Sequence, residues 1–169
     1  MANADSTTFA RPEIEPAINT LLKTPLGLGM DLFQILDACE YHADALIEND
    51  GVTERLALCG RLLAGLEVLK TILDEPLPSH LIEHLTVDIA EKDNYRCPLS
   101  TDSETLREYC TALSLLLLQR QQSAEQEEHI TGLLFELINI LVEDLKAPRF
   151  VNTDAGLVMI SGKSKPDIH

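Results

Sequence analysis

The 169-residue chain contains few aromatic residues and no tryptophan. Aromatic residues make up 4% of it, whereas leucine recurs throughout. Because strands favour aromatic and β-branched residues, this composition indicates helices rather than a β-sandwich. We predict an all-α fold, an antiparallel bundle of about five to six helices. A short apolar C-terminal extension follows it and could form a small β-hairpin.

Cations are also scarce, since 13 Lys and Arg stand against 28 Asp and Glu, which gives a formal net charge of −15. Affinity for nucleic acids and for anionic lipids comes largely from Lys and Arg. We therefore expect no direct nucleic-acid partner and no membrane partner. An acidic protein that mimics nucleic acid is a weaker alternative, because an acidic surface is explained by solubility alone.

Targeting and disulfide signals are absent as well. The N-terminal residues lack a basic segment followed by an apolar one, and no apolar run reaches the roughly 18 residues of a membrane span. Cys39, Cys59, Cys97 and Cys110 are widely separated and form no C-x-x-C motif. We interpret them as reduced thiols and expect a cytoplasmic protein.

The common catalytic motifs are missing too. G-x-G-x-x-G, G-x-x-x-x-G-K-[ST] and G-x-S-x-G do not occur. Tyr41, His42 and Asp44 place a phenol, an imidazole and a carboxylate close together, but consecutive helical residues point in different directions. We interpret this string as a polar outer face. The sequence predicts no catalytic residue and no cofactor site, which favours a non-enzymatic protein.

The pattern divides the chain into three parts. Residues 1–11 are polar and form an expected flexible N-terminus, residues 12–147 form one helical domain, and residues 148–169 form the extension, whose end we expect to be disordered. Apolar residues at spacings of three and four indicate helices within the domain. The expected helices are 12–23, 30–49, 53–74, 79–92, 101–122 and 123–146.

The last of these helices carries the strongest signals. Ser123 and Gln126 fit a capping box, and Pro148 stops the helix. Its apolar residues cover more than half of its circumference, which is wider than a helix wetted on one side requires. The preceding helix, for which Thr101 and Glu104 suggest a second capping box, is also apolar over a wide arc. The additional apolar surface of these two helices must be buried either against the rest of the fold or against another subunit.

The helix at 53–74 adds a stripe of small residues, which fits tight internal packing or a subunit interface. On these grounds we expect a non-enzymatic adaptor, chaperone-like protein or regulatory subunit that acts through helix surfaces as a homodimer. The candidate interface residues are Gly60, Ala64, Leu115, Leu118, Phe135, Ile138 and Val142.

An alternative function rests on the string His80-Leu81-Ile82-Glu83-His84. Histidines at positions i and i+4 share one helix face, as helical zinc sites require, and the pattern H-x-x-E-H also occurs in one class of zinc protease. The competing interpretation is a pair of exposed histidines beside an apolar stripe. The alternative is therefore a small metal-binding protein or metal-dependent enzyme that uses His80 and His84, with zinc as the expected ion.

Overall fold

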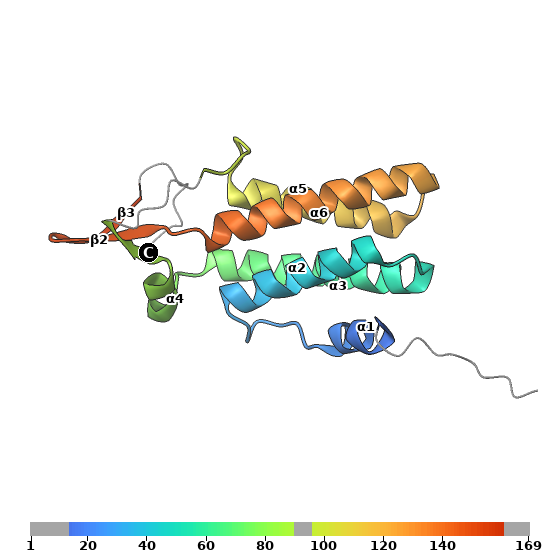
Figure 1. Ribbon diagram of the computed structural model, residues 1–169, viewed down its shortest axis with the longest axis horizontal. Coiled ribbons are helices and arrows are strands. Elements are labelled where there is room, and N and C mark those ends of the chain that lie inside the picture. Colours follow the sequence, from blue (N-terminus) through green and yellow to red (C-terminus); the bar gives the residue numbers. More distant parts are fainter. Residues whose placement is uncertain (1–13, 90–95, 161–169) are drawn as a thin grey trace, which may run out of the picture.

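The structure is a computed structural model, which describes residues 14–89 and 96–160. Four long helices form an up-down-up-down bundle (Figure 1). They are α2 (Leu32–Glu48), α3 (Val52–Asp74), α5 (Ser103–Gln119) and α6 (Ala124–Lys146). Helix α2 packs on α3 and α6, and α5 packs on the same two helices. The predicted helical bundle is confirmed. The expected flexible segments 1–11 and 161–169 lie outside the described residues.

Smaller elements flank the bundle. Helix α1 (Ile14–Lys23) contacts α2 and α3. At one end of the bundle, α4 (Ser79–His84) leads into a three-stranded sheet (Figure 1). Its strands are β1 (Thr86–Asp88), β2 (Phe150–Thr153) and β3 (Gly156–Met159), in the order β1-β2-β3. Strand β1 runs parallel to β2, and β3 runs antiparallel to β2. The predicted hairpin of the extension is therefore confirmed.

The helix predicted at 79–92 is wrong from Leu85 to Ile89, where the chain turns into β1, and its last residues, 90–92, lie outside the described residues. The β-branched residues Thr86 and Val87 suit a strand, and they pair with Phe150 and Val151 of β2. The carbonyl of Leu85 accepts the backbone N–H of Phe150 at 3.1 Å. This pairing, which joins distant parts of the sequence, overrides the local helical pattern.

The helix starts show one correct and one incorrect capping prediction. Ser123 Oγ accepts the Gln126 backbone N–H at 3.2 Å, and Gln126 Oε1 accepts the Ser123 N–H at 3.1 Å, so this capping box is confirmed. The box predicted for Thr101 and Glu104 is wrong. Asp102 caps α5 instead, because its carboxylate accepts the backbone N–H of Thr105 at 2.7 Å.

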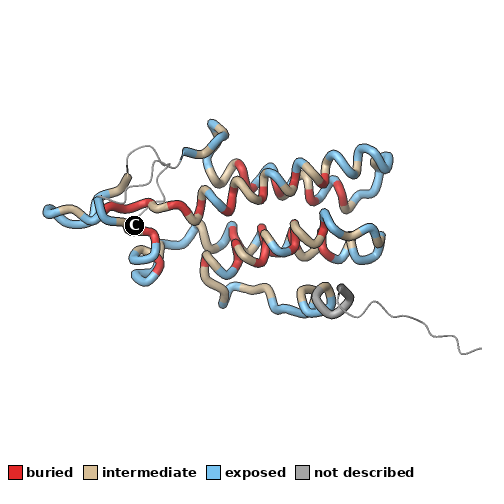
Figure 2. The backbone as a smooth tube through the Cα atoms, viewed as in Figure 1, coloured by how far each residue is buried: buried red, intermediate tan, exposed pale blue. Residues whose placement is uncertain are grey.

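Helix α6 is apolar over a wide arc because it lies between two neighbours. Leu134, Ile138 and Leu141 are fully buried and belong to the main apolar cluster. Figure 2 shows such buried positions along the four long helices of the bundle. On one flank, Lys146 Nζ reaches Asp37 Oδ1 of α2 at 2.6 Å. On the other flank, the Ser103 hydroxyl of α5 donates to the carboxylate of Asp144. Much of the wide apolar surface of α6 is therefore buried in the core of this chain and needs no second subunit to cover it.

Among the small residues of α3, only some are explained by tight internal packing. A Cβ built on Gly65 would lie 3.0 Å from the Cys39 sulfur, so this glycine permits the close approach of α2 and α3. A Cβ built on Gly60 would meet no atom within 4 Å, and Ala64 is exposed. Internal packing therefore explains Gly65 but does not explain Gly60 and Ala64.

Candidate functional site

The outward side of α5 carries large apolar side chains in contact with solvent. Tyr109 is 50% exposed, Leu115 is 46% exposed and Leu116 is 37% exposed. Leu133 of α6 is 50% exposed. We refer to these four residues, together with the exposed Ala112 between them, as the α5 face. Scattered single apolar residues on a surface are normal, whereas a contiguous group marks a contact surface.

Helical geometry places the members of the α5 face together. Tyr109, Ala112 and Leu116 are spaced by three and four and therefore share one flank of α5. That flank is turned toward α6, because Ser114 on the other flank contacts α3. On α6, Leu133 lies about three turns before Asp144, which bonds to α5, and so shares the flank that meets α5. Tyr109, Ala112, Leu116 and Leu133 thus line one seam between two antiparallel helices, and Leu115 lies beside this seam on the outward side of α5.

The α5 face adjoins the open part of α3. The Cys59 thiol donates to the backbone carbonyl of Ser114 at 3.2 Å, so the turns of α3 and α5 that contain Gly60 and Leu115 lie close together. Leu118, half-buried, lies one turn after Ser114 on the same flank of α5. On its α3 side, the outward surface of α5 is therefore bordered by Leu118 and lies near Gly60, where an added Cβ would meet no atom within 4 Å.

Charge around the α5 face is largely acidic. Glu108, Glu136 and Glu143 are exposed on the outward sides of α5 and α6. The two basic residues within these helices are already paired with carboxylates. Arg107 Nη2 pairs with Glu104 at 2.5 Å, and Lys146 pairs with two carboxylates of α2. Among the described residues at this face, Arg120 at the end of α5 is exposed and cationic.

The seven predicted interface residues differ in how far they are exposed to solvent. Leu115 and Ala64 are exposed, and Leu118 and Gly60 are half-buried beside them. Ile138 and Val142 lie in the core of this chain and are not accessible to a partner in this fold. Phe135 is half-buried on the α2 flank of α6, away from the α5 face. Sequence reasoning missed Tyr109, Leu116 and Leu133, because periodicity alone places them on the inward face.

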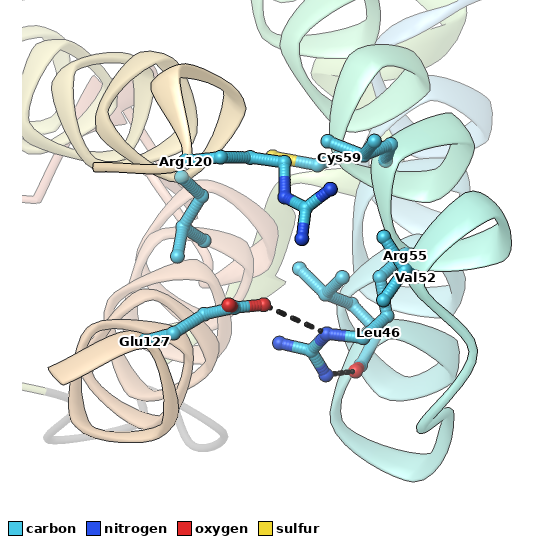
Figure 3. A pocket seen from close by; sticks show the side chains of 8 residues that line it. Leu46, Val52, Arg55, Cys59, Arg120 and Glu127 are labelled. Carbon is cyan, nitrogen blue, oxygen red and sulfur yellow. Dashed lines mark hydrogen bonds and ion pairs between the residues drawn. The ribbon is translucent and has the colours of Figure 1, made fainter. Parts of the chain in front are cut away.

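Beneath one end of this surface, Arg55 joins three elements (Figure 3). Its guanidinium donates to Glu127 Oε1 at 3.2 Å and to Thr131 Oγ1 at 2.9 Å on α6. It also donates to the backbone carbonyls of Leu46 at 2.8 Å and Asn49 at 3.0 Å at the end of α2. The adjoining cavity is about 20 Å³, room for one water and no larger ligand. Arg55 therefore has a structural role, because it connects α3 with the end of α2 and with α6.

His42 is buried, contrary to the interpretation of its string as a polar outer face. Arg61 Nε donates to His42 Nε2 at 3.2 Å, so the imidazole carries its proton on Nδ1 and donates it to the carbonyl of Ala38. Arg61 also donates to the carbonyl of Thr24, which follows α1. Tyr41 is exposed, so the structure does not bring it together with His42 in a catalytic arrangement.

Burial, with a contribution from the Arg61 charge, lowers the pKa of His42, although the hydrogen bond to Ala38 opposes the shift. The unfolded chain therefore binds a proton on this residue at a higher pH than the folded chain does. The His42 contribution to stability is full above a pH of about 6.5 and declines as the pH falls below it, by up to about 1.4 kcal/mol per pH unit.

We accordingly expect His42→Gln to show a smaller loss of stability between pH 7.5 and 5.5 than the wild-type protein. Urea unfolding at several pH values measures this difference. His129→Gln, which changes an exposed histidine of α6, is the matched control for the loss of an imidazole. Equal pH dependence for all three proteins would contradict the assignment to His42.

The buried thiols are unsuited to nucleophilic chemistry. Burial raises the pKa of Cys39 to about 12, that of Cys110 to about 12 and that of Cys59 to about 11. The thiolate is the reactive form, so these three residues stay protonated near neutral pH. They contribute to the core as small apolar side chains.

The proposed zinc residues lie on α4, where both His80 and His84 are exposed. The ring of His84 contacts that of Phe33, with 5.8 Å between their centroids. Among the described residues, no group of three His, Cys, Asp or Glu is placed to hold a metal ion. The zinc alternative therefore stays a prediction, with no third ligand to support it within that part of the chain.

A second, open groove of about 400 Å³ lies between α4 and the sheet. It is lined by apolar residues such as Ile82 and Leu157 and by the carboxylates of Glu83 and Asp88. No cation stands among its lining residues, and the hydroxyl of Thr86 donates to the backbone carbonyl of Ile82. This groove presents carboxylates without a partner group for acid–base chemistry, and it defines no reaction.

Comparison of the chain with protein-family models, with curated proteins and with solved structures gave no match. Within residues 14–89 and 96–160, no helix is long and apolar enough to cross a membrane.

Proposed function

We propose that this chain is a non-enzymatic, cytoplasmic protein-interaction module, an adaptor or regulatory subunit that acts as a homodimer and binds its partner through the α5 face. The observation that carries the proposal is the exposure of Tyr109, Leu116 and Leu133 along the seam between α5 and α6, with the exposed Leu115 beside them on the outward side of α5. Exposed apolar side chains gathered on helices are typical of surfaces that receive an amphipathic helix.

Charge indicates the chemistry of that partner. Glu108, Glu136 and Glu143 surround the apolar seam, and the chain as a whole carries a net charge of −15. A second copy placed on this face would bring like charges together, which is unfavourable. A helix with an apolar stripe flanked by Lys and Arg complements both the seam and its acidic border. The proposed partner segment is therefore a basic amphipathic helix.

A synthetic peptide tests this pairing. It carries leucines at positions i, i+3, i+4 and i+7 and lysines on the flanking positions, and a matched peptide carries glutamates in their place. We expect fluorescence anisotropy to show binding of the basic peptide, at least tenfold tighter than that of the acidic one. Binding should weaken when the ionic strength rises from about 0.05 to 0.5 M, because the attraction between exposed charges is screened.

Variants locate the binding surface. The double variant Leu115→Glu, Leu116→Glu should lose the basic peptide, whereas Leu28→Glu should retain it, because Leu28 is exposed far from α5 in the connection between α1 and α2. Circular dichroism checks that both variants keep their helices. Equal affinity for the two peptides, or full binding by the double variant, would contradict the proposal. A wild-type dimer that only the double variant dissociates would assign the α5 face to a second copy.

A further inference from the structure

Within the part of the chain that the structure describes, the last strand of the sheet presents an apolar edge with which no other strand pairs. Strand β3 pairs with β2 on one side, and it is the terminal strand in the order β1-β2-β3. Leu157 is 50% exposed and Val158 is 49% exposed, although their side chains point to opposite faces of the sheet. Proteins protect edge strands with Lys, Pro or a covering segment. The run from Gly156 to Ile160 contains no charge and no proline.

The hydrogen-bond pattern identifies the groups at this edge. The backbone N–H of Ile160 donates to the carbonyl of Arg149 at 2.9 Å, so Ile160 faces β2. The N–H of Phe150 donates to Leu85 beside β1, so its antiparallel partner Met159 does not bond to β2. Because inward and outward groups alternate along an antiparallel strand, the N–H and C=O of Met159 and Leu157 point away from the sheet.

This edge is complementary to itself. If two copies of β3 lie antiparallel with Val158 at the two-fold axis, Leu157 of each copy stands opposite Met159 of the other. The outward N–H and C=O groups of both residues then satisfy one another as hydrogen-bonded pairs. Val158 meets its own counterpart in a non-hydrogen-bonded pair, where the side chains approach closely. Such an isologous contact closes as a dimer.

Electrostatics favours a second copy here more than at the α5 face. The chain is strongly acidic, so a self-contact is most favourable where no carboxylates are brought together. The segment from Gly156 to Ile160 is uncharged, and Figure 1 shows the hairpin projecting from the end of the bundle, away from the long helices. The acidic surfaces of two bundles joined through this edge need not meet.

We propose that β3 is the dimerisation element of this protein, and that two copies join edge to edge into one continuous six-stranded sheet across a two-fold axis at Val158. The inference specifies the homodimer of the proposed function and is independent of the α5 face. It leaves that face free in each copy to receive a partner.

Disulfide trapping tests the axis directly. Val158→Cys is made in a Cys97→Ser background, which removes the thiol that is not in the core. A non-hydrogen-bonded antiparallel pair has a Cα separation of about 4.5 Å, which is compatible with a disulfide. Mild oxidation should convert most of this variant into a covalent dimer. Asp154→Cys in the same background is the control, because this exposed turn residue lies far from its counterpart in the proposed dimer.

Charge variants supply a second readout. Val158→Lys and Val158→Glu should each be monomeric by light scattering, because like charges meet at the axis, and an equimolar mixture should recover a dimer. A monomeric wild-type protein at about 100 μM, or equal crosslinking of the two cysteine variants, overturns the proposal. A dimer that both charge variants retain also overturns it. Peptide binding to the α5 face is unaffected by these changes, so the two proposals fail separately.

Discussion

Replacing Ile138 by alanine is expected to lower the free energy of unfolding by about 2–5 kcal/mol, the range for large aliphatic residues removed from a packed core. Ile138 is fully buried in the centre of the bundle, where it belongs to the main apolar cluster. The cost combines the lost burial of the side chain with the cavity that remains when neighbouring helices cannot collapse. Urea unfolding followed by circular dichroism measures the change.

Leu115→Ala is the matched control. Both residues were predicted from the sequence as interface candidates, but Leu115 is exposed on the α5 face. Its truncation should change the free energy of unfolding by no more than about 0.5 kcal/mol, as is usual for surface positions. Similar losses for the two variants would show that the outward side of α5 is covered in the folded protein, which would contradict the α5 face.

Replacing Arg55 by methionine is expected to cost about 2–3 kcal/mol, since hydrogen bonds from a charged donor contribute about 1.5–3 kcal/mol and unpaired acceptors stay in the fold. The guanidinium holds the end of α2 through the carbonyls of Leu46 and Asn49, and it holds α6 through Thr131 and Glu127. Methionine keeps most of the side-chain volume, so the effect isolates these polar contacts. Urea unfolding of the Arg55→Met variant measures the loss.

Glu127→Gln separates the ion pair from the rest of this network. The Glu127 side chain is partly exposed, and ion pairs of this kind contribute about 0–1 kcal/mol. We expect a cost within that range, because the bonds of Arg55 to the backbone of α2 remain. A Glu127 variant as destabilised as Arg55→Met would show that the ion pair, rather than the capping of α2, holds this end of the bundle.

The long helices were predictable because their signals are local. The spacing of apolar residues and the capping box at Ser123 both lie within a few residues of the feature that they determine. Asp102 was missed as the cap of α5 because Thr101, one residue earlier, also satisfied the capping pattern. An error of one residue at a helix end is common, since several polar residues there compete for the same backbone N–H groups.

Strand β1 could not be predicted from its own residues. Thr86 to Asp88 is too short to show an alternating pattern, and its partner β2 begins at Phe150, far along the chain. The free edge of β3 follows from the same pairing, because the direction of each N–H depends on where β2 lies. Both features belong to tertiary structure that sequence periodicity does not encode.

The candidate site was only partly predictable for a related reason. Sequence patterns showed that α5 and α6 are apolar over wide arcs, but not which flank of each helix is covered. Ile138 and Val142 are in the core because α6 lies between α2 and α5, whereas Leu115 is exposed because nothing among the described residues packs on the outer side of α5. Burial of His42 likewise depends on Arg61 of the neighbouring helix.

The most direct test of the α5 face is methyl-resolved NMR of the protein during titration with the basic amphipathic peptide. We predict that the methyl signals of Leu115, Leu116 and Leu133 shift and saturate together, while those of the core residue Leu134 and of Val158 on β3 stay in place. No shift, or shifts centred on β3 or spread over the whole protein, would contradict the assignment of the α5 face as the binding surface.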